Sequence, residues 1–436
     1  MRALAAARIL LLAPVVALLA TSCSRELPTA SRGTAQATPR LVSKRFGTRE
    51  VGGEVVITLA NAAEADQIAA SYGAEIVAID STDGVVSIMP GGSDTQASLL
   101  AKLHGDPRVE TSEPNEYFEP AEARQKSFAF DDGIELQSAY VSQPAATAMH
   151  FDLAHQISSG WGVRVAILDT GIDPAHPLFA GRIADAWDFI DDQPGATDVA
   201  EGVDTNGDGV VDEAWGHGTH VAGIVTLTAP GARLLVGRVL DSDGQGDVLT
   251  VAAGIHWAVD SGARVINLSL GSYSDSPAIS SALQEAAVHG VVVVAAAGNM
   301  GAEQPVEYPA AYATPEAVAA SDVSADPAPW TSYGTFVDIS APGIAIRSAY
   351  PGGQYRLWSG TSMSTPFVAG TAALLLGLHP GWGTADVFAR IAATSQHLNN
   401  VAATEAGKLG AGMLDSGAAL APDAPSDFNP IVQPHH

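Results

Sequence analysis

The sequence contains a single cysteine, Cys23, among 436 residues. No disulfide can form within the chain, so a small domain held together by disulfides is excluded. Basic residues are also scarce, because 21 Lys and Arg stand against 48 Asp and Glu, a formal net charge of −27. A field of this sign repels phosphate backbones, so nucleic acid is not expected as a partner.

The apolar run near the N-terminus, Ile9–Ala20, is too short to span a bilayer comfortably. It follows Arg2 and Arg8, a layout that is typical of a secretory signal peptide. We therefore expect residues 1–23 to direct export. Over the whole chain, 47% apolar and only 16% charged residues, with 44 Gly and 26 Pro, indicate an ordered α/β protein with many loops.

Residues 20–23, Ala-Thr-Ser-Cys, resemble the bacterial lipobox, in which small residues precede a cysteine that is acylated and becomes the new N-terminus. The usual leucine three positions before the cysteine is missing here, since Ala20 stands in its place. We expect a lipid on Cys23 and a protein of the cell envelope. The alternative is ordinary signal peptidase cleavage near Ser22, with secretion of the enzyme.

The first half of the chain divides into a polar spacer, residues 24–48, and a compact domain, residues 49–120. The apolar pattern of this domain predicts strands and helices in the order βαββαβ, which is a split ferredoxin-like fold. The predicted strands are 54–59, 75–79, 84–89 and 108–112, and the predicted helices are 62–72 and 95–103.

Residues 121–148 lose the periodicity and are interpreted as a junction, and residues 421–436 as a tail. Between them, residues 149–420 alternate apolar strands with helical stretches. The strand candidates are 163–168, 234–239, 265–268 and 290–297. Near-continuous apolar strands between helices predict an α/β domain whose doubly wound, mostly parallel sheet is covered on both faces.

Three segments carry the chemistry: 167–173 (ILDTGID), 217–223 (HGTHVAG) and 360–366 (GTSMSTP). In this order, and with Ala297-Gly298-Asn299 between the last two, they resemble the subtilase family of serine peptidases. The resemblance covers residues 149–420 and implies a subtilisin-like fold and peptide-bond hydrolysis. The preceding βαββαβ domain resembles the inhibitory propeptide of the family, which implies a self-processed zymogen.

The triad residue types suit acyl transfer, since a serine hydroxyl needs a base in reach and a carboxylate behind that base. Ser362 follows glycine and precedes an apolar helical run, so it is the predicted nucleophile. His217 is the predicted general base, and Asp169, at the end of an apolar strand, orients it. The competing imidazole is His220, three residues on, which we expect to face into the domain.

Asn299 follows an apolar strand and is predicted to donate its side-chain amide to the tetrahedral oxyanion, with the backbone amide of Ser362 as second donor. The alternative is an ordinary turn asparagine. Catalysis by these four groups needs no cofactor.

Further substrate contacts follow from the resemblance. Two edge segments are expected to hold an extended peptide as an added strand. Their residues are Gly244 and Gly246 in the first, and Ser269, Leu270 and Gly271 in the second. The pocket for the residue before the cut is expected to be lined by Ala296, Ala297 and Gly298. The alternatives are a glycine-rich turn and a buried strand.

Glu307 stands just before Tyr308-Pro309, where the family usually has a small or neutral residue at the floor of that pocket. A carboxylate there would accept a substrate Arg or Lys, and the junction offers Arg124 and Lys126 as cut sites. The alternative is that Glu307 points to solvent and the pocket takes apolar residues.

An acidic loop just before the base starts like an EF-hand, although Trp215 stands where the closing glutamate is expected. It predicts structural calcium, and the candidate ligands are Asp204, Asn206, Asp208 and Asp212. The alternative is an acidic surface loop without metal.

The sequence therefore predicts an exported serine endopeptidase that acts on extended protein segments through an acyl-enzyme on Ser362. Its expected partners are protein substrates, its own propeptide as inhibitor, and a membrane reached only through the lipid. Two rivals remain: an inactive homologue that merely holds peptides, and a calcium-dependent scaffold of the cell envelope.

Overall fold

The structure, a computed structural model, describes residues 41–43, 52–124 and 127–422, all of which belong to one unit of the chain, Pro39–His436. The predicted signal peptide, Cys23 and most of the predicted spacer and tail lie outside these residues. We refer below to residues 41–43 and 52–115 as the N-terminal unit and to residues 127–422 as the large domain.

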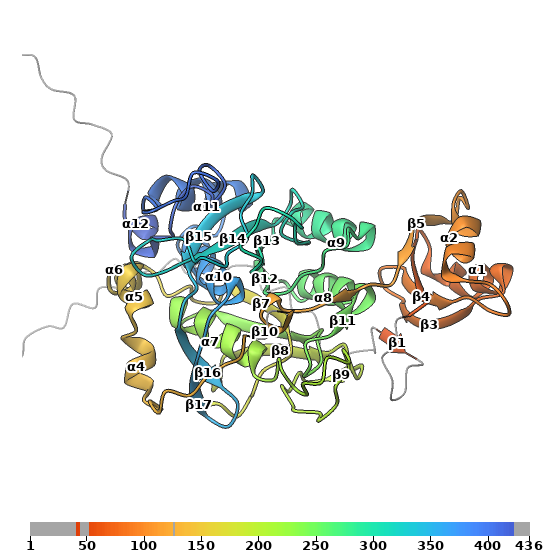
Figure 1. The fold of residues 1–436 in the computed structure, drawn as a ribbon, viewed down its shortest axis with the longest axis horizontal. Coiled ribbons are helices and arrows are strands. Elements are labelled where there is room, and N and C mark those ends of the chain that lie inside the picture. Colours follow the sequence, from red (N-terminus) through yellow and green to blue (C-terminus); the bar gives the residue numbers. More distant parts are fainter. Residues whose placement is uncertain (1–40, 44–51, 125–126, 423–436) are drawn as a thin grey trace, which may run out of the picture. The chain divides into compact units, whose positions relative to one another are not determined.

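An eight-stranded sheet forms the centre of the large domain (Figure 1). Neighbouring strands are parallel throughout, except that the short edge strand β9 runs antiparallel to β8. The predicted doubly wound, mostly parallel sheet is thereby confirmed. In spatial order the strands are β15 (Val337–Pro342), β14 (Glu316–Ser321), β13 (Val292–Ala296), β12 (Val265–Leu268), β7 (Arg164–Asp169), β10 (Arg233–Arg238), β8 (Ile183–Asp188) and β9 (Gln193–Pro194).

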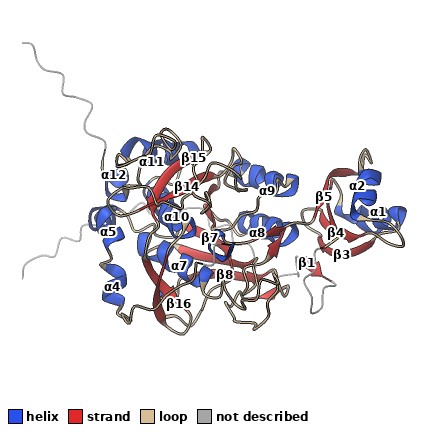
Figure 2. Cartoon of the chain, viewed as in Figure 1, coloured by secondary structure: helices blue, strands red, loops and turns tan. Residues whose placement is uncertain are grey.

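Alternate residues of the central strands enter two different apolar cores. Val165 and Ile167 of β7 join one cluster, whereas Ala166 and Leu168 join the other, because successive side chains of a strand point to opposite faces. Both faces must therefore be covered by helices, as Figure 2 shows. This explains why the strands read as continuous apolar runs.

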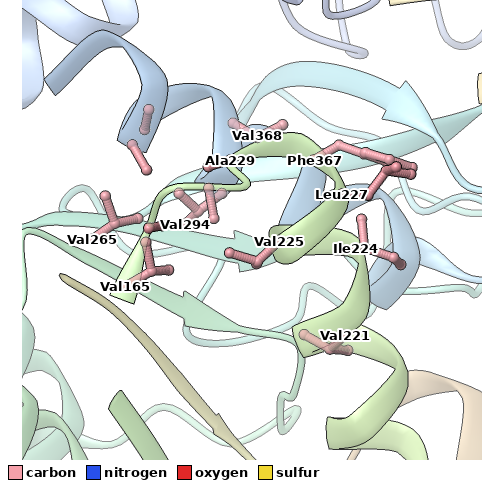
Figure 3. Close-up of a cluster of buried hydrophobic side chains, with 14 of the residues drawn as sticks. Val165, Val221, Ile224, Val225, Leu227, Ala229, Val265, Val294, Phe367 and Val368 are labelled. Carbon is pink, nitrogen blue, oxygen red and sulfur yellow. The ribbon is translucent and has the colours of Figure 1, made fainter. Parts of the chain in front are cut away.

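The first face packs against α7 (His217–Thr228) and α10 (Thr361–Leu378), and Figure 3 shows part of this core around Val225 and Phe367. Smaller helices join the same cluster: α6 (Phe151–Ile157), α11 (Thr384–Thr394) and α12 (Ser416–Leu420). The second face packs against α8 (Val248–Asp260) and α9 (Pro277–Val288). In the described part of the chain, α10 alone has the length and composition to cross a membrane, but 89% of it is buried, so it is a core helix.

The N-terminal unit contains an antiparallel sheet in the order β1-β3-β4-β2-β5, with α1 and α2 between strands in the predicted βαββαβ order. The strands are β1 (Leu41–Ser43), β2 (Val55–Leu59), β3 (Glu75–Asp80), β4 (Val85–Met89) and β5 (Val109–Pro114). The helices are η1 (Ala62–Glu64), α1 (Ala65–Tyr72) and α2 (Gln96–Leu103). The interpretation of residues 24–48 as spacer throughout is wrong at β1, whose backbone pairs with the edge strand β3.

The predicted junction, residues 121–148, also contains regular elements. These are α3 (Ala121–Arg124), α4 (Gln137–Val141) and α5 (Pro144–Ala148), and just ahead of them lies β6 (Tyr117–Phe118). Elements of two to five residues are too short to show a full apolar period, which is why the sequence pattern missed them.

The N-terminal unit is joined to the large domain by polar and apolar contacts at α8 and α9. Glu113 Oε1 accepts a hydrogen bond from the Ala278 amide at the start of α9 (2.9 Å), and Asn115 Nδ2 donates to Asp247, the N-cap of α8 (3.3 Å). Val56 and Val85 of the N-terminal unit belong to the same core cluster as these helices. The free Ala278 amide at the N-terminus of α9 is thus satisfied by a side chain of the N-terminal unit.

Candidate active site

The three predicted triad residues lie at element ends that meet at one edge of the sheet. Asp169 is the last residue of β7, His217 the first of α7 and Ser362 the second of α10. Asp169 Oδ1 lies 2.7 Å from His217 Nδ1, and both side chains are fully buried. The carboxylate therefore fixes the orientation of the ring and leaves Nε2 toward the serine.

Gly218 explains how α7 approaches the β7 strand end so closely. A Cβ at this position would lie 2.2 Å from the Gly171 carbonyl oxygen and 3.1 Å from the Asp169 Cβ. A glycine after the histidine is thus required by the short distance between the base and its carboxylate.

Asn299 is held so that its amide nitrogen faces the serine. Its Oδ1 accepts hydrogen bonds from the Thr361 amide (3.0 Å) and hydroxyl (2.9 Å), so the opposite side of the amide group, Nδ2, is free to donate. Nδ2 and the Ser362 amide donate to the same oxygen, at 2.8 Å and 3.3 Å. Two convergent donors of this kind form an oxyanion hole.

The oxygen in this hole belongs to Glu122, a residue that the sequence did not single out. Glu122 Oε1 accepts both hydrogen bonds, while Oε2 accepts one from Ser362 Oγ (2.5 Å) and lies 3.5 Å from His217 Nε2. The side chain is fully buried. A carboxylate in this place resembles in shape and charge the acid group of a cleaved product.

The Glu122 carboxylate changes the electrostatics of the triad. Burial disfavours the imidazolium, but the carboxylates of Asp169 and Glu122 outweigh it and raise the pKa of His217 to about 10. Burial likewise disfavours the charge on Glu122, but His217 and the hydrogen bonds of Ser362 and Asn299 outweigh it and lower its pKa. Within the described residues, His217 Nε2 has no hydrogen-bond partner. The raised pKa favours a protonated His217, and Ser362 Oγ donates to Glu122 and not to the base.

The segment just before Glu122 lies between the two predicted edge segments. Phe118 of β6 pairs antiparallel with Gly246 of β11 (Gly246–Asp247), and Glu119 exchanges two backbone hydrogen bonds with Gly271, of 3.0 and 2.9 Å. A Cβ on Gly244 would lie 3.0 Å from Pro120 Cδ. The chain thus binds its own residues 117–119 as an added strand.

The remaining residues of the second edge segment have different surroundings. Ser269 O accepts a hydrogen bond from Ser362 Oγ (3.2 Å), and its own hydroxyl donates to the Ser362 carbonyl (3.0 Å). Leu270 is fully buried and belongs to the same apolar cluster as Phe118 of the bound segment, and its contact with substrate stays a prediction.

The predicted first pocket contains a buried ion pair. Glu307 is only 2% exposed, so the alternative that it points to solvent is wrong. Arg124 of α3 donates to Glu307, and its Nη1 also donates to the Gly271 carbonyl (3.2 Å). Burial raises the pKa of Glu307 to about 7, although Arg124 opposes the shift.

Two glycines give Glu307 its place between the walls of this pocket. A Cβ on Gly271 or on Gly298 would lie 2.5 Å or 2.2 Å from the Glu307 side chain. Ala296, the last residue of β13, and Ala297 are buried, and the Ala297 amide donates to the Val318 carbonyl. Glu307 thus lies between Gly271 and Gly298, and a lining role of the two alanines stays a prediction.

His220 is fully buried, and its Nε2 lies 3.1 Å from the Ile346 carbonyl and 3.2 Å from the Arg356 carbonyl. Burial is the main cause that lowers its pKa to about 3. A neutral ring that donates to two backbone carbonyls of the β16 (Ile346–Tyr350) and β17 (Gln354–Trp358) hairpin has a structural role.

The four predicted calcium ligands do not point to a common centre. Asp204 accepts hydrogen bonds from the amides of residues 207–209, and Asp212 from those of Glu201 and Gly202. Two other acids carry buried oxygens without hydrogen-bond partners among the described residues, Glu213 Oε2 and Asp243 Oδ1. The backbone of Asn206 donates to Asp243 (3.2 Å) and its amide group to Glu213 (2.7 Å), so these three groups are neighbours.

Comparison with known families and sequences gives one consistent result. The Subtilase family, Peptidase_S8, matches residues 160–412. Subtilisin amylosacchariticus of Bacillus subtilis subsp. amylosacchariticus is 39% identical over 272 residues, which cover 60% of this chain and 66% of that relative. Thermitase of Thermoactinomyces vulgaris is 42% identical over 232 residues, which cover 51% of this chain and 77% of thermitase.

Solved structures show the same similarity. Fervidolysin from Fervidobacterium pennivorans, described as a keratinolytic enzyme related to subtilisin, superposes with a TM-score of 0.68 at 25% identity. The match covers 84% of this chain and 60% of fervidolysin, so it extends well beyond the residues matched by the family. A cold-adapted subtilisin-like serine proteinase matches with a TM-score of 0.53 at 31% identity, over 59% of this chain and 90% of that one.

Proposed function

Because the chain belongs to the subtilase family, we propose that it is an exported serine endopeptidase made as a latent, self-processed precursor. The observation that carries the proposal is that the Asp169–His217 pair, the Ser362 hydroxyl and the two donors of Asn299 and Ser362 meet around one carboxylate, that of Glu122. These groups supply every function that acyl transfer from a peptide needs.

The reaction follows from this geometry once Glu122 leaves the site. Ser362 Oγ attacks the peptide carbonyl carbon while His217 Nε2 takes the hydroxyl proton, and Asp169 stabilises the imidazolium. Asn299 Nδ2 and the Ser362 amide stabilise the oxyanion. His217 then gives its proton to the leaving nitrogen as the C–N bond breaks. Water hydrolyses the acyl-enzyme in the same manner and restores the Ser362 hydroxyl.

Residues 49–120, together with the α3 segment that follows them, act in this proposal as the inhibitory propeptide. Support comes from the added strand at 117–119 and from the Glu122 carboxylate, which occupies the oxyanion hole and pairs with His217. No substrate carbonyl can use the two donors while Glu122 accepts from both. Self-cleavage therefore requires α3 to unfold, so that a peptide carbonyl replaces the carboxylate.

Glu307 gives the first pocket a preference for Arg or Lys. Support comes from the guanidinium of Arg124, which this carboxylate binds between Gly271 and Gly298. In an extended chain, Arg124 in this pocket would direct the cut to the Arg124–Gln125 bond. This is the processing site that we propose.

Calcium is proposed as a structural ion near the acidic loop, and its proposed ligands are Glu213 and Asp243. Their unpartnered buried oxygens fit a hard cation, since calcium binds carboxylate and amide oxygens. When bound, the ion would neutralise mutual repulsion among these acids. Lipidation at Cys23 remains our proposal for attachment to the cell envelope.

The decisive experiment compares the purified wild type with Ser362→Ala. Wild-type protein should react with a fluorophosphonate at Ser362 and should carry a new N-terminus near Gln125, whereas Ser362→Ala should stay unlabelled and unprocessed. An inactive homologue that merely holds peptides would stay unlabelled in both forms. Equal processing of both proteins would exclude self-cleavage.

A further inference from the structure

Two carboxylates of the N-terminal unit and one imidazole of the large domain meet away from the active site. Asp80 is the last residue of β3, Asp83 lies in the turn that leads to β4, and His256 lies in α8. His256 Nδ1 lies 3.3 Å from Asp83 Oδ2 and 3.8 Å from Asp80 Oδ2. One ligand-type atom from each residue falls within 4.8 Å of the others.

Two of the three residues are buried, the Asp83 side chain is 19% exposed, and the polar atoms are aimed at one another. Asp80 is fully buried and His256 is 7% exposed. Asp80 Oδ1 accepts hydrogen bonds from the amides of Thr82 (3.0 Å) and Asp83 (3.4 Å), which directs Oδ2 toward the histidine. Neither Asp80 Oδ2 nor His256 Nδ1 has a hydrogen-bond partner in the part of the chain that the structure describes. Two such buried atoms side by side need an explanation.

We propose that Asp80, Asp83 and His256 bind a divalent transition-metal ion of the zinc class. Two tetrahedral ligands about 2.0–2.1 Å from zinc lie about 3.3 Å apart, so the observed spacings require only small side-chain adjustments. One nitrogen and two oxygens are a donor set for such an ion, with water completing the shell. Its charge neutralises two carboxylates that are otherwise buried beside each other.

Glu285 of α9 supports this assignment as a positioning residue. Its Oε2 lies 3.6 Å from His256 Nε2, the ring nitrogen that faces away from the cluster. A carboxylate on the far nitrogen of a metal-binding histidine fixes the tautomer and makes the ring a better ligand. Both ring nitrogens of His256 are thereby assigned a role.

The ion would join the N-terminal unit to α8 of the large domain. Metal binding itself does not depend on the proposed peptidase activity. If that activity is correct, the ion strengthens the hold of the propeptide on the enzyme, and its removal speeds the release of the propeptide after cleavage.

The test uses the full-length Ser362→Ala variant, stripped of metal and kept in excess calcium so that oxygen-only sites are filled. Titration with Co²⁺, followed by visible absorption, should saturate at one equivalent, and Zn²⁺ should displace the cobalt. Zn²⁺ should also raise the melting temperature. Both effects should vanish in His256→Gln and Asp80→Asn, and Glu285→Gln should weaken binding by about 10-fold.

Asp66→Asn is the matched control, since it removes an exposed carboxylate of the same N-terminal unit. It should bind cobalt like the parent. If Asp80→Asn does not fold, His256→Gln decides the question alone. Absence of binding in the parent, or binding that survives in His256→Gln, overturns the proposal. A melting temperature that depends on pH but not on added metal also overturns the proposal, since it would identify a protonated His256 paired with the two carboxylates.

Discussion

At the scale of single residues, Glu122 has the strongest influence on the state of the active site. A peptide carbonyl carries full negative charge only during the reaction, whereas the Glu122 carboxylate carries it permanently. The donors of the oxyanion hole and the protonated His217 therefore bind this side chain more strongly than they bind a ground-state substrate. In the proposed precursor, latency comes from the preference of these groups for a negatively charged oxygen, and the same preference would stabilise the oxyanion during catalysis.

Glu122→Gln should accelerate conversion of the precursor. The variant loses the charge that pairs with His217. A hydrogen bond to a charged group contributes about 1.5–3 kcal/mol, so the ratio of precursor with the site blocked to precursor with the site open should fall by roughly 10- to 100-fold. The half-time of conversion, followed by gel after refolding, measures the effect. Glu110→Gln, at an exposed position, is the control. An unchanged half-time would show that Glu122 does not limit processing.

Glu307→Gln should remove the preference for arginine before the cut. We expect kcat/KM for an Arg substrate to fall by roughly 10- to 100-fold, from the loss of a buried charge-assisted contact, while a Leu substrate is affected little. Glu303→Gln, in the same loop but 44% exposed, is the control. A ratio of Arg to Leu cleavage that is the same in wild type and Glu307→Gln would mean that the pocket is simply apolar.

The pH dependence of the Arg preference follows from the same carboxyl group. Burial raises the pKa of Glu307 to about 7, so the group is neutral below and charged above that value. The ratio of Arg to Leu cleavage should therefore rise between about pH 6 and about pH 8. Because His217 titrates for both substrates, taking the ratio removes its contribution. A ratio that stays flat over this range would assign the preference to another group.

At the scale of elements, the acidic loop 201–213 should make stability depend on calcium and pH together. Burial raises the pKa of Glu213 to about 7, and that of Asp243 is also raised. A carboxyl group with a raised pKa in the folded state contributes stability at low pH, which is lost as the pH rises through about 7. Bound calcium should restore this stability at higher pH, because it neutralises the charge of the ionised Glu213 and Asp243.

Chelation should consequently lower the melting temperature more at about pH 8 than at about pH 5.5. Differential scanning calorimetry of Ser362→Ala, which avoids self-digestion, measures this difference. Glu213→Gln should reduce the effect, and Asp185→Asn, an exposed site on β8, should not. Equal melting temperatures with and without chelator at both pH values would contradict the calcium site.

Elements with a clear period were predictable from sequence, and those without one were not. The βαββαβ order follows from the apolar periods of eight-residue helices and of strands of five or six residues, and the triad from three glycine-rich motifs. By contrast, β15 reads VDISAP, a short alternation of apolar and polar residues that lacks the continuous apolar run of the central strands, and the β16–β17 hairpin is defined by backbone pairing. Glu122 contacts residues up to 240 positions away, and nothing in its neighbours distinguishes it from the other acids.

At the scale of the whole molecule, the N-terminal unit should bind the mature enzyme through its contacts with helix N-termini. Glu113→Ala removes the acceptor for the Ala278 amide, and loss of a helix cap costs about 1 kcal/mol. The separately produced unit should therefore inhibit about fivefold less well, as measured by its inhibition constant. Glu110→Ala, exposed on the same strand, is the control. Equal inhibition by both variants would show that this contact adds no affinity.

The proposed cut after Arg124, at the end of α3, also determines where the active enzyme ends up. Cys23 lies on the N-terminal side of the bound segment 117–124, so a lipid there stays with the fragment that carries the inhibitor. Fractionated cells should hold all Ser362→Ala precursor in the membrane, whereas the wild-type enzyme should partition into the medium as the inhibitor dissociates. In this proposal the lipid holds only the inactive precursor at the membrane, and self-cleavage frees the active enzyme from the cell.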